Sequence, residues 1–264
     1  MSGEGGFAPW LARWQLAVDG QPFDSRNGHL LPVRWRGQAA LLKLSHHPEE
    51  QAGGRLMAWW SGDGAAPVLA IDGPALLLAR ADGDRSLGVL ALDGHDDEAT
   101  RLLCTVAARL HAPRRASVPP LMTLARWFEP LTSVAHDGTL ALAARVARAL
   151  LEAPCDPVVL HGDLHHGNVL HFGPAGWLAI DPKALHGERG FDFANLLCNP
   201  DPALAAEPAR FARRVAIVSE SAALDRDRLL AGCSRGAGCR RCGSWRTASR
   251  RTACSRWRGW RRQA

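Results

Sequence analysis

Hydrophobic and polar residues alternate along residues 14–44 in three runs separated by polar turns. The runs are WQLAV, LLPVRW and AALLKL, and the intervening DGQPFDSRNG and RG are rich in turn-forming residues. Period-two alternation interrupted in this way predicts an antiparallel meander. Two further apolar runs, PVLAID and ALLLAR, flank Gly73-Pro74. The first 80 residues are therefore predicted to be rich in β-strand.

One helix is expected within this β-rich part. Pro48 suits the first turn of a helix, and Glu49 and Glu50 favour the positive end of the helix dipole. The helix is predicted to run to about Trp60 and to end at SGDG.

From residue 81 the hydrophobic spacing changes to that of helices. Leu102, Leu103, Val106 and Leu110 recur every three or four residues after the acidic opening Asp96-Asp97-Glu98. Further helical runs are expected at 121–135, 139–152, 191–197 and 208–223. The pattern predicts an α/β (α+β) fold with a β-rich lobe at 1–80, a helical lobe at 81–230 and a separate segment at 231–264.

The segment 231–264 differs from the rest in charge and composition. It holds ten Arg and no Lys, Asp or Glu, so it carries +10, whereas the whole chain carries +6 and residues 1–230 therefore carry −4. Four of the seven Cys also lie in it, and it contains no Leu, Ile or Val. Such a segment has no apolar face to bury.

Three interpretations of this segment are open. Clustered Arg with Trp245, Trp257 and Trp260 could bind nucleic acid non-specifically. The cysteines Cys233, Cys239, Cys242 and Cys254 could form a zinc knuckle, although their spacing fits no strong template. The composition is also typical of GC-rich DNA translated in a shifted reading frame, and this interpretation is favoured.

The chain as a whole indicates a cytoplasmic protein. The N-terminus has no basic stretch followed by an apolar run, and no apolar stretch approaches the roughly 20 residues that span a bilayer. Cys104, Cys155 and Cys198 have no paired spacing, which is typical of reduced thiols. A membrane partner is not expected.

The stretch 158–181 carries the clearest chemistry. An apolar strand leads into His-Gly-Asp, a short polar loop ends at Asn168, and the last strand of a hairpin delivers Asp181. Two carboxylates and one amide thus stand at loop and strand ends. Oxygen ligands of this kind suit Mg²⁺ rather than zinc.

Phosphoryl transfer needs a lysine and a cation on the phosphates, and a carboxylate beside the acceptor hydroxyl. Lys43 in the third strand supplies the lysine, and Glu50 is expected to orient it, although the adjacent Glu49 is an alternative. Asp163 is placed to accept the hydroxyl proton, while Asn168 and Asp181 would hold the cation.

The motifs together resemble the aminoglycoside phosphotransferase family, and within it the streptomycin 6-phosphotransferase and hydroxyurea phosphotransferase group. The likeness covers roughly residues 10–230. It is carried by WW-SGDGA at 59–65, RLH-AP at 109–113, HGDLHHGNVL at 161–170, WLAIDPK at 177–183 and GERGFDFANLLCNPD at 187–201.

This resemblance implies a protein-kinase-like two-lobed fold and MgATP as cofactor. It makes Asp163 the catalytic base, Asn168 and Asp181 the metal ligands, and Lys43 the phosphate-binding lysine. The implied activity is phosphorylation of a small antibiotic, most simply streptomycin at its 6-hydroxyl. The alternatives are hydroxyurea phosphorylation, and an inactive remnant or a nucleic-acid-binding protein in which the basic segment has replaced the end of the helical lobe.

Two residues depart from regulated protein kinases. Gly162 stands where those kinases have Arg, and Pro182 follows Asp181 in place of Phe-Gly, so a fixed metal site and constitutive activity are expected. No Gly-rich phosphate loop is evident, and DSRNG at 24–28 is the best candidate.

Other polar residues have supporting or less specific interpretations. His161 is expected to support the catalytic loop by hydrogen bonding rather than to carry protons, and Asp192 to support the same loop from behind. A zinc cluster of His165, His166 and His171 is disfavoured because the set lacks ligand spacing. A cationic substrate needs carboxylates, for which the candidates are Glu188, Asp201 and Glu129.

Overall fold

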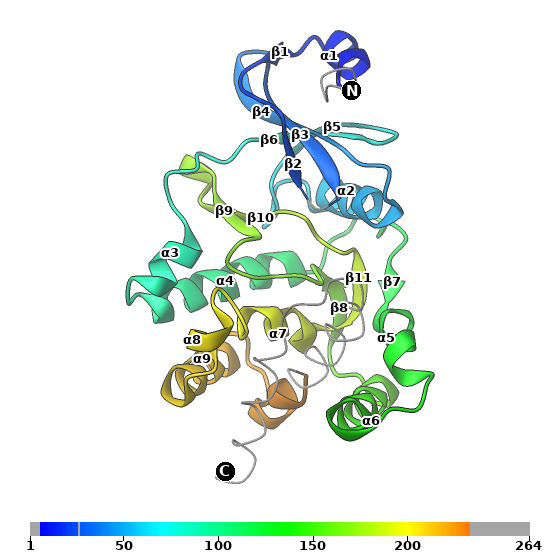
Figure 1. The fold of residues 1–264 in the computed structure, drawn as a ribbon, viewed down its shortest axis with the longest axis vertical. Helices are drawn as coiled ribbons and strands as arrows, with labels where there is room; N and C mark the ends of the chain where they lie inside the picture. The colour runs from blue at the N-terminus through cyan, green and yellow to red at the C-terminus, as the bar shows by residue number, and fades with distance from the viewer. Residues whose placement is uncertain (1–5, 26, 233–264) are drawn as a thin grey trace.

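An antiparallel sheet forms the upper part of the molecule in Figure 1. The computed structural model describes residues 6–25 and 27–232. The strand order is β1-β3-β4-β6-β5, and β2 pairs with β3. The strands are β1 (Ala17–Val18), β2 (Phe23–Ser25), β3 (Gly28–Trp35), β4 (Gln38–Leu44), β5 (Val68–Asp72) and β6 (Ala75–Ala79).

Two helices accompany this sheet, α1 (Ala8–Trp14) and α2 (Pro48–Trp60). Helix α2 has the predicted bounds, with Pro48 at its start and a left-handed residue, Ser61, as its C-cap. The meander and the later strand pair are confirmed as well. Helix α1 and strand β2 were not predicted. Helix α1 spans only seven residues, and β2 lies within a turn-rich stretch.

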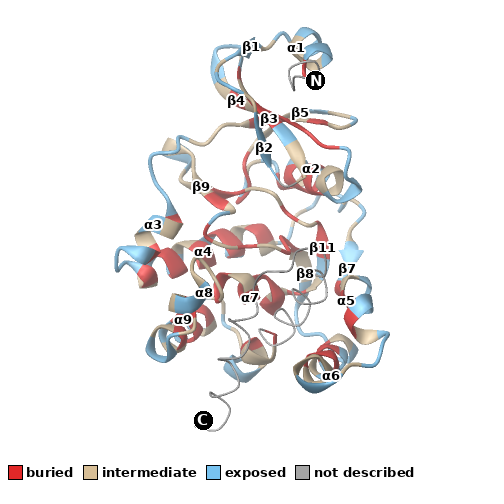
Figure 2. Cartoon of the chain, in the orientation of Figure 1, coloured by how far each residue is buried: buried red, intermediate tan, exposed pale blue. Residues whose placement is uncertain are grey.

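The lower part is mainly helical. Its labelled helices are α3 (Leu87–Leu92), α4 (Asp96–His111), α5 (Leu124–Thr132), α6 (Gly138–Glu152), α7 (Phe193–Leu196), α8 (Pro202–Ala205) and α9 (Pro208–Ser221), and the described residues end in a further helical stretch at 226–232. Figure 2 shows α4 with a long buried face at the centre of this part. The helix expected from residue 121 begins only at Leu124, because Met122 and Thr123 form a short strand and the Thr123 hydroxyl accepts from the Arg126 amide.

Two small sheets lie among these helices. Strand β9 (Val169–His171) pairs with β10 (Trp177–Ala179) in the predicted hairpin, with the 3₁₀ turn η1 (Gly173–Ala175) between them. Strand β11 (Leu185–Glu188) lies between β7 (Met122–Thr123) and β8 (Pro157–Leu160), and the 3₁₀ turn η2 (Arg189–Asp192) follows it. This arrangement brings the two ends of the 158–181 stretch together.

The two parts are joined where α2 ends. The Trp60 indole Nε1 donates to the Leu110 carbonyl across 3.0 Å, so the end of α2 rests on the end of α4. Gly64 and Ala66 exchange backbone hydrogen bonds of 2.9 Å with Ala179 of β10. The segment that leads into β5 is therefore hydrogen-bonded directly to the hairpin that leads to Asp181.

Within the described residues, no helix combines the length and the apolar character needed to cross a bilayer. The predictions for 231–264, including the shifted reading frame, fall outside the described residues from 233 onward.

Candidate active site

Lys43 lies at the centre of an ion-pair group between the sheet and α2, in which Lys43 and Glu50 are buried and Asp181 is partly exposed. Its Nζ is 2.5 Å from Glu50 Oε2 and also contacts Asp181 Oδ1. Burial alone would lower the pKa of Lys43, but the carboxylates of Asp181 and Glu50 outweigh burial and raise it. Conversely, Lys43 holds the pKa of Asp181 below its ordinary value although burial opposes this. Both groups are therefore charged at neutral pH.

Glu50, rather than Glu49, is the helix residue that faces Lys43. Its second oxygen, Oε1, accepts from Asn27 Nδ2 at 3.1 Å and lies 3.7 Å from Lys183 Nζ. One carboxylate thus links the strand lysine, the β2–β3 turn and the segment after Asp181. The turn is the DSRNG stretch proposed from the sequence as a phosphate loop, and its Asn27 lies beside the lysine.

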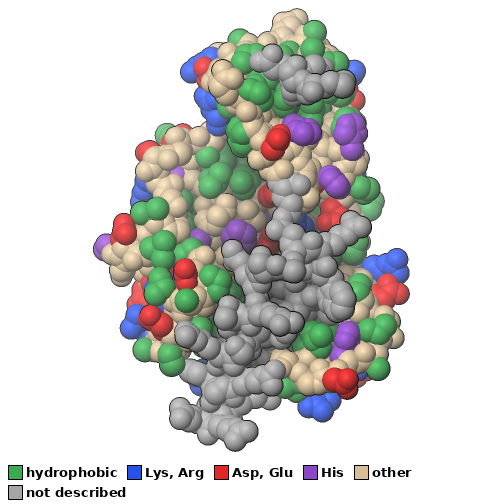
Figure 3. Space-filling model, viewed as in Figure 1, with side chains coloured by type: hydrophobic (Ala, Val, Ile, Leu, Met, Phe, Trp, Pro, Cys, Tyr) green, Lys and Arg blue, Asp and Glu red, His purple; other side chains and the backbone are tan. Residues whose placement is uncertain are grey.

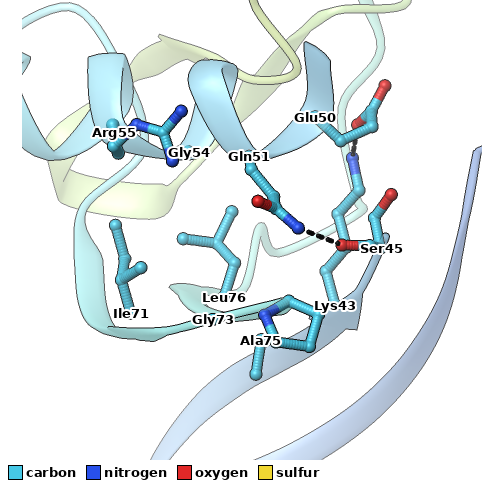
Figure 4. Close-up of a pocket in the computed structure, with 11 residues that line it drawn as sticks. Lys43, Ser45, Glu50, Gln51, Gly54, Arg55, Ile71, Gly73, Ala75 and Leu76 are labelled. Carbon is cyan, nitrogen blue, oxygen red and sulfur yellow. Dashed lines mark hydrogen bonds and ion pairs between the residues drawn. The ribbon is translucent and has the colours of Figure 1, made fainter. Parts of the chain in front are cut away.

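The surroundings of Lys43 are closely packed. A cavity of about 30 Å³ lies between Lys43, α2 and strands β5 and β6 (Figure 4). Gln51 crosses it to donate to the Ser45 carbonyl at 3.3 Å. A space of this size accommodates about one water molecule.

The loop that carries Asp163 is held from behind by Asp192. The Asp192 carboxylate accepts the backbone amides of His161 at 2.9 Å and Gly162 at 2.6 Å, and the ring of His111 donates to it at 2.8 Å. Burial would raise the pKa of Asp192, but the His111 contact and the Gly162 amide lower it. Asp192 thus lies where the sequence analysis expects it to support the loop.

His161 is fully buried and has a fixed tautomer. Its Nε2 donates to the Ile180 carbonyl at 2.8 Å, and its Nδ1 accepts the Asp163 amide at 3.2 Å. Burial lowers the pKa of the ring, so His161 stays neutral. Both ring nitrogens are engaged with backbone, which is the arrangement of a supporting residue and not of a proton carrier.

Gly162 has a positive φ of +83°. A Cβ on it would lie 2.8 Å from Leu185 Cδ1 and 3.0 Å from Lys183 Cβ. No side chain fits there without displacing β11, which gives a steric reason for glycine at the position where regulated protein kinases have Arg.

Asp163 itself is one-third exposed. Its Oδ1 accepts from Asn195 Nδ2 at 2.6 Å and lies 3.9 Å from His165 Nε2. The side-chain Nδ2 of Asn168 donates to the backbone carbonyl of Asp163 at 2.9 Å. This hydrogen bond identifies Oδ1 of the Asn168 side chain as the oxygen that is available as a ligand. Asp163, Asn168 and Asp181 therefore belong to one connected loop and hairpin.

The residues present fit a divalent cation such as Mg²⁺. Asn168 has a carbonyl oxygen available, and Asp181 keeps one carboxylate oxygen beyond the one that contacts Lys43. Hard oxygen donors of this kind are the ligands that Mg²⁺ prefers. In Figure 3, acidic and histidine side chains are visible where the upper and lower parts meet.

The histidines that the sequence considered for zinc are not gathered. His165 folds over Gly167, whose amide donates to its Nδ1 at 3.0 Å, and His166 is buried toward Arg214 and Asp96. His171 lies on β9, beside Asp82 and Asp84 of the connection between the two parts.

The candidate substrate carboxylates are dispersed. Glu188 lies at the opposite end of β8 and β11 from His161, where it is buried in a two-point contact with Arg228 at 2.7 Å. Asp201 caps α8 by accepting the Ala203 and Leu204 amides. Glu129 pairs with Arg126 on the surface of α5. The structure does not bring Glu188 to the group around Asp163.

Three residues of this site were missed from the sequence, namely Asn195, Lys183 and His111. All three stand inside motifs quoted for the resemblance, GFDFAN, IDPK and RLH, but no spacing rule connects them to Asp163 or Glu50. The only signal available was that each of these polar residues lies within a quoted motif.

Residues 13–241 match the family described as aminoglycoside/hydroxyurea antibiotic resistance kinase, so the match extends beyond Leu230, where the sequence analysis ends the resemblance. A streptomycin 3''-kinase of Klebsiella pneumoniae is 48% identical over 226 residues, covering 83% of this chain and 85% of its own.

Two more distant relatives cover less of their own length. A hydroxyurea phosphotransferase of Kitasatospora aureofaciens is 37% identical, covering 74% of this chain and 61% of its own. A streptomycin 6-kinase of Streptomyces glaucescens is 34% identical, covering 69% of this chain and 62% of its own. Among solved structures, aminoglycoside phosphotransferase APH(4)-Ia in complex with ADP and hygromycin B has a TM-score of 0.53 at 13% identity, covering 88% of this chain and 97% of that one. This last likeness confirms the kinase-like fold.

Proposed function

The chain belongs to the aminoglycoside/hydroxyurea antibiotic resistance kinase family, and from this premise we propose that it transfers the γ-phosphate of ATP to a hydroxyl of streptomycin. The enzyme class, a small-molecule antibiotic kinase, follows from the family. The observation that carries the proposal is the connection of Asp163, Asn168 and Asp181 to Lys43 through one loop and one hairpin.

Each polar residue has a role in this proposal. Lys43, oriented by Glu50, binds the phosphates of ATP. Asn168 and Asp181 hold Mg²⁺, which when bound neutralises the phosphate charge and orients the γ-phosphate. Asp163 accepts the proton of the acceptor hydroxyl. As that O–H bond breaks, the acceptor oxygen bonds to the γ-phosphorus, and the bond between this phosphorus and the β–γ bridging oxygen breaks with its electron pair left on ADP.

For the acceptor position, we favour the 3''-hydroxyl over the 6-hydroxyl expected from the sequence. The 3''-kinase relative is 48% identical and matches along 85% of its length, whereas the 6-kinase relative is 34% identical along 62%. Substrate-binding residues differ more between distant relatives than catalytic ones do, so the greater identity supports the 3'' position.

Hydroxyurea is the second candidate substrate, because one relative is a hydroxyurea phosphotransferase. Hydroxyurea lacks the guanidinium groups and sugar rings of streptomycin and needs no large pocket. A kinase selective for streptomycin should discriminate strongly against it, since remote contacts with the larger substrate contribute to transition-state binding.

The test is product analysis with purified protein, MgATP and each compound separately. We expect ADP and a singly phosphorylated streptomycin whose phosphorus couples, in a two-dimensional ¹H–³¹P spectrum, to the proton on C3''. Coupling to the C6 proton would reverse the assignment of the acceptor. Phosphorylation of hydroxyurea alone would replace streptomycin as the substrate, and ATP-independent DNA binding without any transfer would refute the kinase proposal.

A further inference from the structure

Asn195 makes a direct hydrogen bond to the carboxylate of Asp163. Its Nδ2 donates to Oδ1 across 2.6 Å, and the bond is partly buried. The other oxygen, Oδ2, accepts no hydrogen bond from the portion of the chain that the structure describes. The two oxygens of one carboxylate are therefore in different environments.

We propose that Asn195 is a positioning residue of the phosphoryl transfer, one that fixes Oδ1 so that Oδ2 meets the acceptor hydroxyl. This inference rests on the proposed function, in which Asp163 takes the hydroxyl proton. An amide NH₂ donates to a carboxylate but cannot take up its proton. The proton of the acceptor hydroxyl therefore goes to Oδ2, while the bond from Asn195 to Oδ1 persists through the reaction.

The backbone around Asn195 is suited to hold this contact. Asp192, three residues earlier, accepts the amides of His161 and Gly162. One short segment thus holds both the backbone of the catalytic loop and the side chain of its base, so the carboxylate and the loop cannot shift independently.

The contribution expected from this contact is orientation rather than affinity. A freely rotating carboxylate spends much of its time turned away from the hydroxyl, and misorientation of a catalytic group costs on the order of 10²-fold in rate. Neither ATP nor the antibiotic needs to touch Asn195. Its loss should therefore lower kcat and leave both KM values nearly unchanged.

Two substitutions separate positioning from simple packing. Asn195→Ala removes the donor, and we expect kcat to fall about 10–100-fold with each KM within about threefold of wild type. Asn195→Asp keeps the shape but places a carboxylate against Asp163, so like-charge repulsion should make it more damaging than Ala. A packing role would give the opposite order, because Asp is nearly isosteric with Asn.

Asn199→Ala is the matched comparison, because it removes one hydrogen bond of 2.8 Å to the backbone carbonyl of Asn195 and leaves the Asn195 side chain on Asp163. We expect its kcat to remain within about threefold of wild type. An equal loss in Asn199→Ala and Asn195→Ala would overturn the proposal, as would a smaller loss of kcat in Asn195→Asp than in Asn195→Ala.

Crystal structures of wild type and Asn195→Ala supply a measurement that does not depend on the acceptor. We expect the Asp163 carboxylate to rotate in the variant while the 161–162 backbone stays on Asp192. An unrotated carboxylate would refute positioning by Asn195 even in an active kinase. If wild type fails to phosphorylate streptomycin but the carboxylate rotates, the substrate proposal fails and the positioning role stands.

Discussion

The backbone of Gly53 in α2 lies directly against the carbonyl oxygen of Pro182, so that a Cβ on Gly53 would be only 2.4 Å from that oxygen. Gly53 is three residues after Glu50, and Pro182 is the residue after Asp181. The helix that orients Lys43 is therefore packed backbone to backbone against the candidate metal-binding segment. This contact gives a physical basis for the expected fixed metal site, because α2 cannot swing without separating from Pro182.

Replacing Gly53 by Ala should push α2 away from Pro182. Alanine favours a helix by about 1 kcal/mol over glycine, but overpacking against backbone costs about 1–3 kcal/mol. We expect a net loss of stability and a lower kcat/KM for ATP, because the Glu50–Lys43 pair moves with α2. Chemical denaturation and steady-state kinetics measure the two effects.

Gly54→Ala is the control in the same helix. Its Cβ would meet only the flexible side chain of Leu76, at 3.3 Å. It should be neutral or stabilising by up to about 1 kcal/mol, with kinetics like wild type. Equal behaviour of the two variants would show that the approach of Gly53 to Pro182 does not matter.

Gly162→Ala tests the steric requirement in the catalytic loop. A positive φ costs a non-glycine residue about 1–2 kcal/mol by itself, and here the Cβ would also collide with Leu185 and Lys183. Gly37→Ala, at φ +84° with nothing within 4 Å, carries the backbone cost alone. Urea midpoints should therefore fall further for Gly162→Ala, and antibiotic phosphorylation should be lost in it only. A smaller loss at residue 162 than at residue 37 would contradict this.

Much of the site could be predicted because its chemistry is local in sequence. Asp163 and Asn168 are five residues apart in one loop, and Lys43 and Glu50 are seven apart across one strand-to-helix turn. Residues this close in sequence remain close in space in any fold that is compatible with the hydrophobic pattern. Asn195 meets Asp163 across 32 residues and only after α7 has packed, so no local pattern indicated the contact.

The fold shows the same difference between features set locally and features set by residues distant in sequence. Helix α4 and strands β3 and β4 were predictable because long periodic runs have one favourable burial pattern. Helix α3 spans six residues, too few to establish a period. The burial of Glu188 depends on Arg228, 40 residues later, so its acidic side chain was interpreted as a possible substrate ligand.

Arg228→Ala should destabilise the protein without affecting substrate affinity. Arg228 makes two 2.7 Å contacts with the buried Glu188, and removing one partner of a hydrogen-bonded charged pair costs about 1–3 kcal/mol. Arg126→Ala, which breaks the exposed pair with Glu129, should cost less than about 1 kcal/mol. A raised KM for streptomycin in Glu188→Gln, at unchanged stability, would instead restore Glu188 as a substrate ligand.

His166 should make the stability depend on pH. Burial beside Arg214 lowers its pKa to about 3, from 6.5 in the unfolded chain. The unfolded state then binds more protons, so stability is complete above pH 6.5 and falls by up to about 1.4 kcal/mol per pH unit toward pH 3. The facing charged groups are Arg214, Asp96, His165 and Arg210.

Denaturation of wild type and His166→Leu between pH 7.5 and 4.5 measures this dependence. The variant should fold at pH 7.5, because neither ring nitrogen of His166 finds a hydrogen-bond partner among the described residues. Its stability should fall less steeply with acid than that of wild type. Parallel pH dependences would mean that His166 takes up its proton without unfolding.

The account as a whole depends on Asp163 acting as the base of a phosphoryl transfer to an antibiotic. The most direct measurement is ADP formation from MgATP, with and without streptomycin, by wild type and by Asp163→Asn, which keeps the size of the side chain. We predict streptomycin-stimulated ADP formation by wild type and a loss on the order of 10²–10⁴-fold in the variant, with ATP binding retained. A rate of ADP formation that does not change when streptomycin is added, or an equal rate in Asp163→Asn and wild type, would contradict the account.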